Sequence, residues 1–196
     1  AVLISANAKN LLELKSAIEN FPHCDLKRGA RNAVFSAGSS ASKIMIIGEA
    51  PGEKEDITGF PFVGRAGKML NTVLHSVDID PLEDCYITNI VKCRPPENRR
   101  PAKTEIETCL SWLDNQIRFL KPSIVILAGS TAVEGYLGIK DPITKIRGSW
   151  IVKDGIKFMP IFHPAYLLRH PSAKDGGPVE LTRQDLSAVR TRLCER

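Results

Sequence analysis

The chain has 196 residues, which fits a single domain of the usual ~100–200 residues. Hydrophobic residues make up 43% and charged residues 25%, a balance that excludes general disorder. Lys and Arg number 27 against 22 Asp and Glu, and this net charge of +5 moderately favours polyanionic partners. The sequence has neither an export signal nor the ~18 consecutive apolar residues of a membrane span. We therefore expect one cytoplasmic, monomeric domain over residues 1–196.

Apolar spacing in the first half of the chain predicts two helices and two strands. The helices are expected over residues 8–18 and 64–77, and short buried strands over residues 43–48 and 86–91. The second half predicts helices over residues 103–120, from Thr131, and over 179–193, with a strand over residues 123–128. A hairpin joins residues 150–152 to 156–160 through Asp154 and Gly155.

Strands that alternate with amphipathic helices predict an α/β fold, a three-layer α/β/α sandwich with a mainly parallel central sheet. Ligands in such folds bind beyond the carboxyl ends of the strands. The segments that follow the strands are therefore the candidate functional segments.

A glycine-rich, acidic segment follows the first strand, at residues 48–56 and 59–64. Its glycines let the backbone approach a flat ligand closely, and exposed amide groups there bind acceptor oxygens. It lacks the Gly-Lys-Ser/Thr end of a phosphate loop and the dinucleotide-binding fingerprint, and its carboxylates would repel a phosphate. A neutral ligand fits better, although an ordinary acidic loop accounts equally for this segment taken alone.

Asn89 and a basic segment follow the second strand. The amide of Asn offers a donor beside an acceptor, which complements the imide edge of a nucleobase. A buried Asn is more often a structural hydrogen-bonding group, and that alternative stays open. Lys92, Arg94 and Arg99 then suit a phosphate backbone, although a solvated loop is the simpler interpretation.

The third segment, residues 161–172, holds His163 where an extended apolar run meets a proline. A lone histidine is usually structural. Here aromatic and leucine residues, among them Leu167, stand beside it with Arg169 next, an arrangement typical of a wedge that enters stacked DNA.

Taken together, these segments resemble the family four uracil-DNA glycosylases, which carry an iron–sulfur cluster. The resemblance runs from about Cys24 to the end of the chain and is carried by residues 48–52, 59–64, 88–96 and 163–169, in that order. It implies the α/β/α fold and hydrolysis of the N-glycosidic bond of uracil in DNA.

The resemblance also implies roles for individual residues. Glu49 and Ala50 form one wall of the uracil pocket, Phe62 stacks on the flipped base, Asn89 bonds its O4 and N3 edge, and His163 lies at its O2. Extruding a base from a duplex costs a few kcal/mol, and stacking offsets that cost.

Bond cleavage leaves negative charge on the uracil, so donors aimed at the developing anion are expected to contribute most. Related family-one enzymes place Asp where this chain has Ala50. We therefore expect His163, Glu49 and Glu55 to be the catalytic groups, with Glu55 orienting the water. The DNA-contacting residues are expected to be Lys92, Arg94, Arg99, Leu167 and Arg169.

Five cysteines in a chain without an export signal argue against a disulfide scaffold. The resemblance implies a [4Fe-4S] cluster held by four cysteines, of which Cys24, Cys93 and Cys109 are present at matching positions. The fourth would fall at position 21, which is Phe21. A non-cysteine ligand, an incomplete cluster, or a lost cluster are the three outcomes left open.

Three alternatives compete with a monofunctional uracil glycosylase. A broader enzyme would also remove hypoxanthine, xanthine or mismatched thymine, and a non-catalytic module would bind DNA without releasing the base. A related subgroup that attaches covalently to DNA uses a histidine after the second strand, and residues 97–101 contain none. No lysine stands in a motif for Schiff-base chemistry, so a lyase step is not expected.

Overall fold

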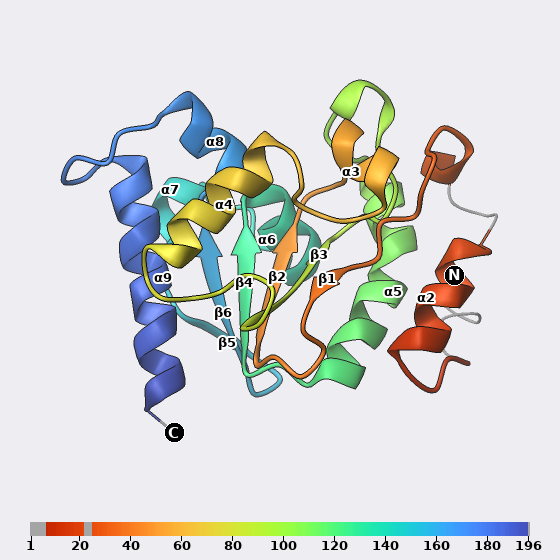
Figure 1. Cartoon of the computed structure of the whole chain (residues 1–196), viewed down its shortest axis with the longest axis horizontal. Coiled ribbons are helices and arrows are strands. Elements are labelled where there is room, and N and C mark those ends of the chain that lie inside the picture. The colour runs from red at the N-terminus through yellow and green to blue at the C-terminus, as the bar shows by residue number, and fades with distance from the viewer. Residues whose placement is uncertain (1–6, 22–24, 196) are drawn as a thin grey trace.

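The computed structural model describes residues 7–21 and 25–195, which form one six-stranded sheet with helices on both faces (Figure 1). The strands lie in the order β1-β3-β2-β4-β6-β5. The four central strands are parallel, and the two edge strands are antiparallel to their neighbours. Their bounds are β1 Ala37–Gly38, β2 Ile44–Gly48, β3 Cys85–Asn89, β4 Ile124–Ala128, β5 Ile151–Lys153 and β6 Ile156–Ile161. This confirms the expected mainly parallel sheet.

The helices form the two outer layers. One face of the sheet is covered by α2 (Leu11–Glu19), α5 (Lys103–Leu120) and α6 (Ser130–Leu137). The other is covered by α4 (Arg65–His75), α8 (Pro164–Arg169) and α9 (Pro178–Cys194), and in Figure 1 α4 lies in front of the strands and α6 behind them. Two shorter helices, α3 (Glu53–Thr58) and α7 (Ile143–Ile146), lie in loops.

The alternation of side chains along β2 explains why both faces need cover. Met45 and Ile47 pack under α5, whereas Ile44 and Ile46 pack under α4, and all four are at most 1% exposed. Side chains of a strand alternate between the faces, so a strand that is apolar at every position has to be buried on both. Neither layer of helices could be removed without exposing half of this core.

Most predicted elements are confirmed within a few residues. The expected helix at 103–120 has those bounds, and the helix expected at 8–18 begins later because Asn10 caps it, accepting a bond from the Glu13 amide at 2.9 Å. The Asp154–Gly155 turn is confirmed, with φ values of 51° and 77° that suit a two-residue hairpin. Helices α3, α7 and α8 and the edge strand β1 were missed, because each is a short segment in a stretch without a predicted element.

The order of the strands creates a crevice at one edge of the sheet. The chain passes from β2 to β3 on one side and then crosses back to β4 and β6 on the other. Connections that leave in opposite directions open a space above the carboxyl ends of the strands between them.

Among the described residues, every helix is too short or too polar to span a bilayer.

Candidate active site

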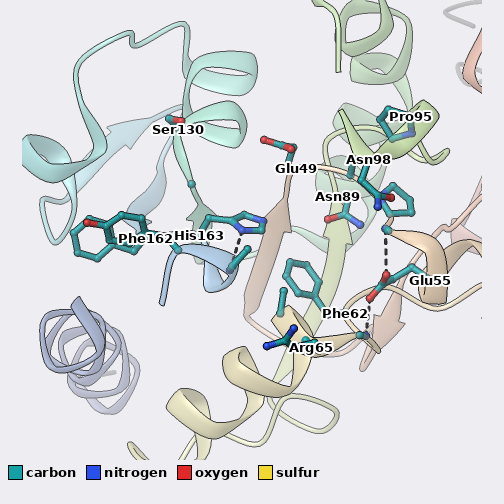
Figure 2. A pocket seen from close by; sticks show the side chains of 18 of the residues that line it. Glu49, Glu55, Phe62, Arg65, Asn89, Pro95, Asn98, Ser130, Phe162 and His163 are labelled. Carbon is teal, nitrogen blue, oxygen red and sulfur yellow. Dashed lines mark hydrogen bonds between the residues drawn. The ribbon is translucent and has the colours of Figure 1, made fainter. Parts of the chain in front are cut away.

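A cavity of about 630 Å³ lies at the carboxyl ends of β2, β3, β4 and β6 (Figure 2). Phe62, Asn89 and His163 all line it, although they are far apart in the sequence. Figure 2 shows Asn89 and His163 on opposite sides of this space, with Phe62 and Glu49 also facing it. The expectation that three separate segments converge on one pocket is confirmed. Of the other expected pocket residues, Ala50 and Glu55 line it as well.

Asn89 is fixed at the last position of β3, directly beside Gly48 at the end of β2. The whole residue is 2% exposed. A Cβ atom on Gly48 would lie 2.4 Å from both Oδ1 of Asn89 and Cζ of Phe62, far inside contact distance. Gly48 therefore leaves the space in which the amide and the ring approach each other.

Phe62 is held by the backbone of α4. Its φ of 56° is unusual for a bulky residue, and such conformations persist only where the surroundings impose them. A Cβ atom on Gly67 would lie 1.6 Å from the carbonyl oxygen of Phe62, so only glycine permits this approach. The ring is thus presented to the cavity by a rigid turn.

His163 occupies the N-cap of α8, where its Nδ1 accepts a hydrogen bond from the amide of Ala165 at 3.1 Å. In the neutral imidazole the other nitrogen, Nε2, then carries the proton and is a donor. Burial lowers the pKa of His163 below its ordinary 6.5; the charge of Glu49 opposes this shift and that of Arg169 adds to it. The site therefore holds a neutral donor at neutral pH.

Glu55 braces the loop that carries Phe62, a role that sequence reasoning missed. Its Oε1 accepts the amide of Gly64 at 2.7 Å and its Oε2 accepts the amide of Gly52 at 3.1 Å. These bonds join the start of α3 to the start of α4 across the intervening turn. Each carboxylate oxygen keeps a second lone pair, so the water-orienting role assigned to Glu55 stays a prediction.

The expected DNA-contacting arginines lie at the surface. Arg99 and Arg169 line the cavity, and Arg94 is half-buried with its Nε bonded to Oδ1 of Asn98 at 2.8 Å. Arg99 is held in a two-pronged ion pair by Glu105. A further exposed arginine on the cavity wall, Arg65, was not anticipated.

Two expected DNA contacts are wrong. Lys92 is 1% exposed, because the turn after β3 directs its side chain inward toward α5, where it bonds Oε1 of Gln116 at 2.7 Å. Burial lowers the pKa of Lys92 to about 7. Leu167 is also 1% exposed, because it lies on the face of α8 that packs against α4. Leu168 next to it is half-buried.

The predicted cluster ligands are described only in part. Cys93 and Cys109 are each 3% exposed and belong to the same apolar core, whereas Cys24 lies outside the described residues. Phe21 is buried with its ring 5.4 Å from that of Trp112, in an edge-on packing. Within residues 7–21 and 25–195, no group of three or more His, Cys, Asp or Glu side chains could hold a metal. The described residues thus do not fit a four-ligand cluster by themselves.

Comparison with known proteins places this cavity in a family. Residues 35–187 match the model of the Uracil DNA glycosylase superfamily. The chain is 41% identical to the Type-4 uracil-DNA glycosylase of Thermotoga maritima over 169 residues, which cover 84% of this chain and 86% of that protein. It is 40% identical to the Type-4 enzyme of Saccharolobus solfataricus over 196 residues, 95% of this chain and 88% of that protein.

The chain is also similar to one part of a larger protein. A DNA polymerase of Bacillus phage SP01 is 37% identical over 138 residues, which cover 70% of this chain but 15% of the polymerase. The same fold therefore also occurs as a small part of a much larger protein.

The matched segment of the family model includes all of the residues that converge on the cavity. By fold, motif order and similarity over most of its length, this chain belongs to the uracil-DNA glycosylase superfamily and to its type-4 family.

Proposed function

We propose that this domain, as a monomer, removes uracil from DNA by hydrolysing its N-glycosidic bond, without a lyase step. The observation that supports this most strongly is the convergence of Phe62, Asn89 and His163 on one cavity at the strand ends. A ring, an amide and a neutral imidazole together match the face, the edge and the leaving-group oxygen of a pyrimidine. The base must leave its duplex to reach them.

Asn89 selects the base through its edge. Its Nδ2 donates to O4 of uracil while its Oδ1 accepts the N3–H, and cytosine offers the reversed pattern at both positions. Phe62 stacks on the face of the base, and such stacking contributes ~1–3 kcal/mol per base. Because Asn89 is 2% exposed, a mismatched base would leave its side-chain amide unpaired in a dry site, which is costly.

His163 stabilises the leaving group. As the bond between C1′ and N1 breaks, its electron pair moves onto the uracil ring and negative charge grows at O2. The neutral imidazole donates Nε2–H to that oxygen, a bond that strengthens with the charge and needs no proton transfer. Water then adds to C1′ and loses a proton to solvent, and the carboxylates of Glu49 and Glu55 favour the cationic sugar.

Arg65, Arg99 and Arg169 line the cavity and neutralise phosphates of the bound strand, and Arg94 contacts the strand farther from the base. Positively charged groups around a pocket supply most of the sequence-independent affinity for DNA, and that affinity falls with salt. The half-buried Leu168 replaces Leu167 as the leucine able to reach the base stack.

Uracil release from labelled oligonucleotides tests the proposal. Single- and double-stranded oligonucleotides with one uracil are incubated with the protein and then cleaved with alkali at abasic sites. We expect cleavage at the uracil by the wild type, and large losses in Asn89→Ala and His163→Ala variants that bind abasic DNA normally. Absence of alkali-labile sites, with retained binding to uracil-containing DNA, would instead indicate a non-catalytic module. Cleavage of hypoxanthine, xanthine or mismatched thymine at similar rates would replace the proposal with the broader enzyme.

The [4Fe-4S] cluster stays a prediction carried by Cys24, Cys93 and Cys109. It is supported by the shared burial of the two described cysteines, which belong to the same core cluster. Iron and sulfide analysis, with absorbance near ~400 nm, tests it in the purified protein. Iron present in the wild type and lost in Cys109→Ser supports the cluster; a protein without iron when purified under argon contradicts it.

A further inference from the structure

The buried side chain of Lys92 contacts the backbone of Asn89, the residue proposed to recognise the base. The ammonium of Lys92 donates to the carbonyl oxygen of Asn89 at 2.6 Å, to Oγ1 of Thr88 at 2.7 Å and to Oε1 of Gln116 at 2.7 Å. The whole residue is 1% exposed. Lysine is almost never fully buried unless it is paired, yet no ion pair of Lys92 with a carboxylate occurs in the described part of the chain.

The partners of Lys92 are fixed by further hydrogen bonds. The Nε2 of Gln116 donates to the carbonyl of Phe35 at 3.2 Å and to the hydroxyl of Tyr86 at 2.9 Å, so its Oε1 is left to accept from Lys92. The hydroxyl of Thr88 donates to the same Phe35 carbonyl at 2.7 Å and is likewise left to accept. Three acceptors thus match the three N–H donors that Lys92 carries in its protonated form, and in that form the network is fully satisfied.

The turn that follows Asn89 is held from two sides. On the side of β2, the amide of Ile90 donates to the carbonyl of Gly48 at 2.9 Å, and the amide of Val91 donates to that of Glu49 at 3.2 Å. On the side of α5, Lys92 holds the carbonyl of Asn89 itself. Because both ends of this peptide unit are bonded, the direction in which the Asn89 side chain leaves the strand is set.

A buried charge is a costly way to fill a core, since an apolar side chain of similar length would pack without desolvation. Such a group is consistent with a requirement for a defined geometry at the residue it binds. Misplacing a reacting or recognising group by about 1 Å can reduce a rate by about 10²-fold.

We propose that Lys92 is a positioning residue for base recognition, which acts by holding the backbone of Asn89 so that its amide meets the uracil edge. The proposal rests on the proposed function, and it assigns to a residue first expected to contact phosphate a role inside the protein. Thr88 and Gln116 belong to the same device, because they complete the coordination of the ammonium.

Two substitutions at different points of the network test this. Lys92→Met keeps the approximate length of the side chain and removes its N–H donors. Thr88→Val keeps the shape and β-strand preference of the side chain and removes one acceptor. Thr88→Ser retains that acceptor. Lys103→Met is the matched control, because the Lys103 side chain is 89% exposed on the same helix α5 as Gln116. All are compared at equal folded fraction, by circular dichroism and thermal melting.

We expect Lys92→Met to lower kcat/KM on uracil by about 10²-fold and Thr88→Val by about tenfold, with Thr88→Ser and Lys103→Met close to wild type. Inhibition by free uracil is expected to weaken in parallel, while affinity for abasic DNA stays within about twofold, since the phosphate contacts are untouched. In an Asn89→Ala background, Lys92→Met is expected to add less than about twofold, because the group it positions is gone.

Unchanged kcat/KM per folded molecule in Lys92→Met and Thr88→Val would overturn the proposal. So would losses that multiply fully with that of Asn89→Ala, or an equal loss of affinity for abasic DNA, because either indicates general damage to the fold. A wild type that releases no uracil would refute the proposed function instead, so the two failures are distinguishable.

Discussion

Gly48→Ala is the substitution whose effect follows most directly from the site. The new Cβ would lie 2.4 Å from Oδ1 of Asn89 and from Cζ of Phe62, whereas carbon atoms in ordinary contact lie about 3.5–4.0 Å apart. Both neighbours must therefore retreat by about 1 Å. The colliding atoms are the tips of side chains, so they can move without shifting the backbone of β2.

The expected result is a loss of activity out of proportion to the loss of stability. A displacement of about 1 Å at two groups that touch the base lowers kcat/KM by about 10²-fold or more. Crowding of a packed site costs ~1–3 kcal/mol in the free energy of unfolding, with the lower end expected here because the tips swing aside. At about 2–4 °C per kcal/mol, that lowers Tm by only a few degrees.

Single-turnover cleavage of a uracil oligonucleotide, with a thermal melt of the same preparation, measures both quantities. Gly29→Ala is the matched control, since a Cβ at Gly29 meets nothing within 4 Å and its φ is not positive. That variant is expected to match the wild type in both measurements. If Gly48→Ala retained kcat/KM within about twofold of Gly29→Ala, the close approach of Phe62 and Asn89 would not be a requirement of the site.

Four other outcomes are expected. Burial, aided by the charge of Arg169 and opposed by that of Glu49, lowers the pKa of His163 below 6.5. We therefore expect kcat/KM to stay flat through neutral pH and to fall only below pH 6.5, where protonation at Nδ1 breaks the cap of α8. A midpoint above pH 6.5 contradicts this. The same shift predicts that the free energy of unfolding decreases as the pH is lowered below 6.5, because the imidazole of the unfolded chain binds a proton at a higher pH than that of the folded protein. Asp185 is 3% exposed and accepts a hydrogen bond from Nε of Arg147 at 2.8 Å, so Arg147→Met leaves an unpaired buried carboxylate. We expect this variant to lose ~3–5 kcal/mol of its free energy of unfolding, measured by urea denaturation. A loss below ~1 kcal/mol contradicts this. Arg169→Ala is expected to reduce the slope of log affinity against log salt by ~0.7–0.9 in DNA titrations, and an unchanged slope excludes a phosphate contact.

Features that depend on neighbours in the chain were predictable. Short apolar runs predict strands over residues 43–48, 86–91 and 123–128, and the structure has buried parallel strands at Ile44–Gly48, Cys85–Asn89 and Ile124–Ala128, because a strand covered on both faces is mostly apolar. Asp154 and Gly155 identify the hairpin, because both residues must adopt positive φ in its turn. Once the parallel strands are predicted, the general rule for such sheets places the ligand site at their carboxyl ends.

Glu55 and Lys92 show where this reasoning fails. Both are charged residues in polar segments, and nothing in their spacing distinguishes a carboxylate that binds water from one that binds two backbone amides. Lys92 was expected at the DNA, yet its partner Gln116 lies 24 positions away, on another layer of the fold. Hydrogen bonds between distant segments have no signature in the local pattern.

The sequence by itself determined the longer helices and the central strands, the order of the motifs and the edge of the sheet at which the site forms, because these depend on periodicity and turn chemistry within a few residues. Only the tertiary structure decided which of the charged and apolar side chains near that edge face the ligand. Burial of Lys92 and Leu167 depends on which helices cover the strand ends, and that is set when the layers pack against one another.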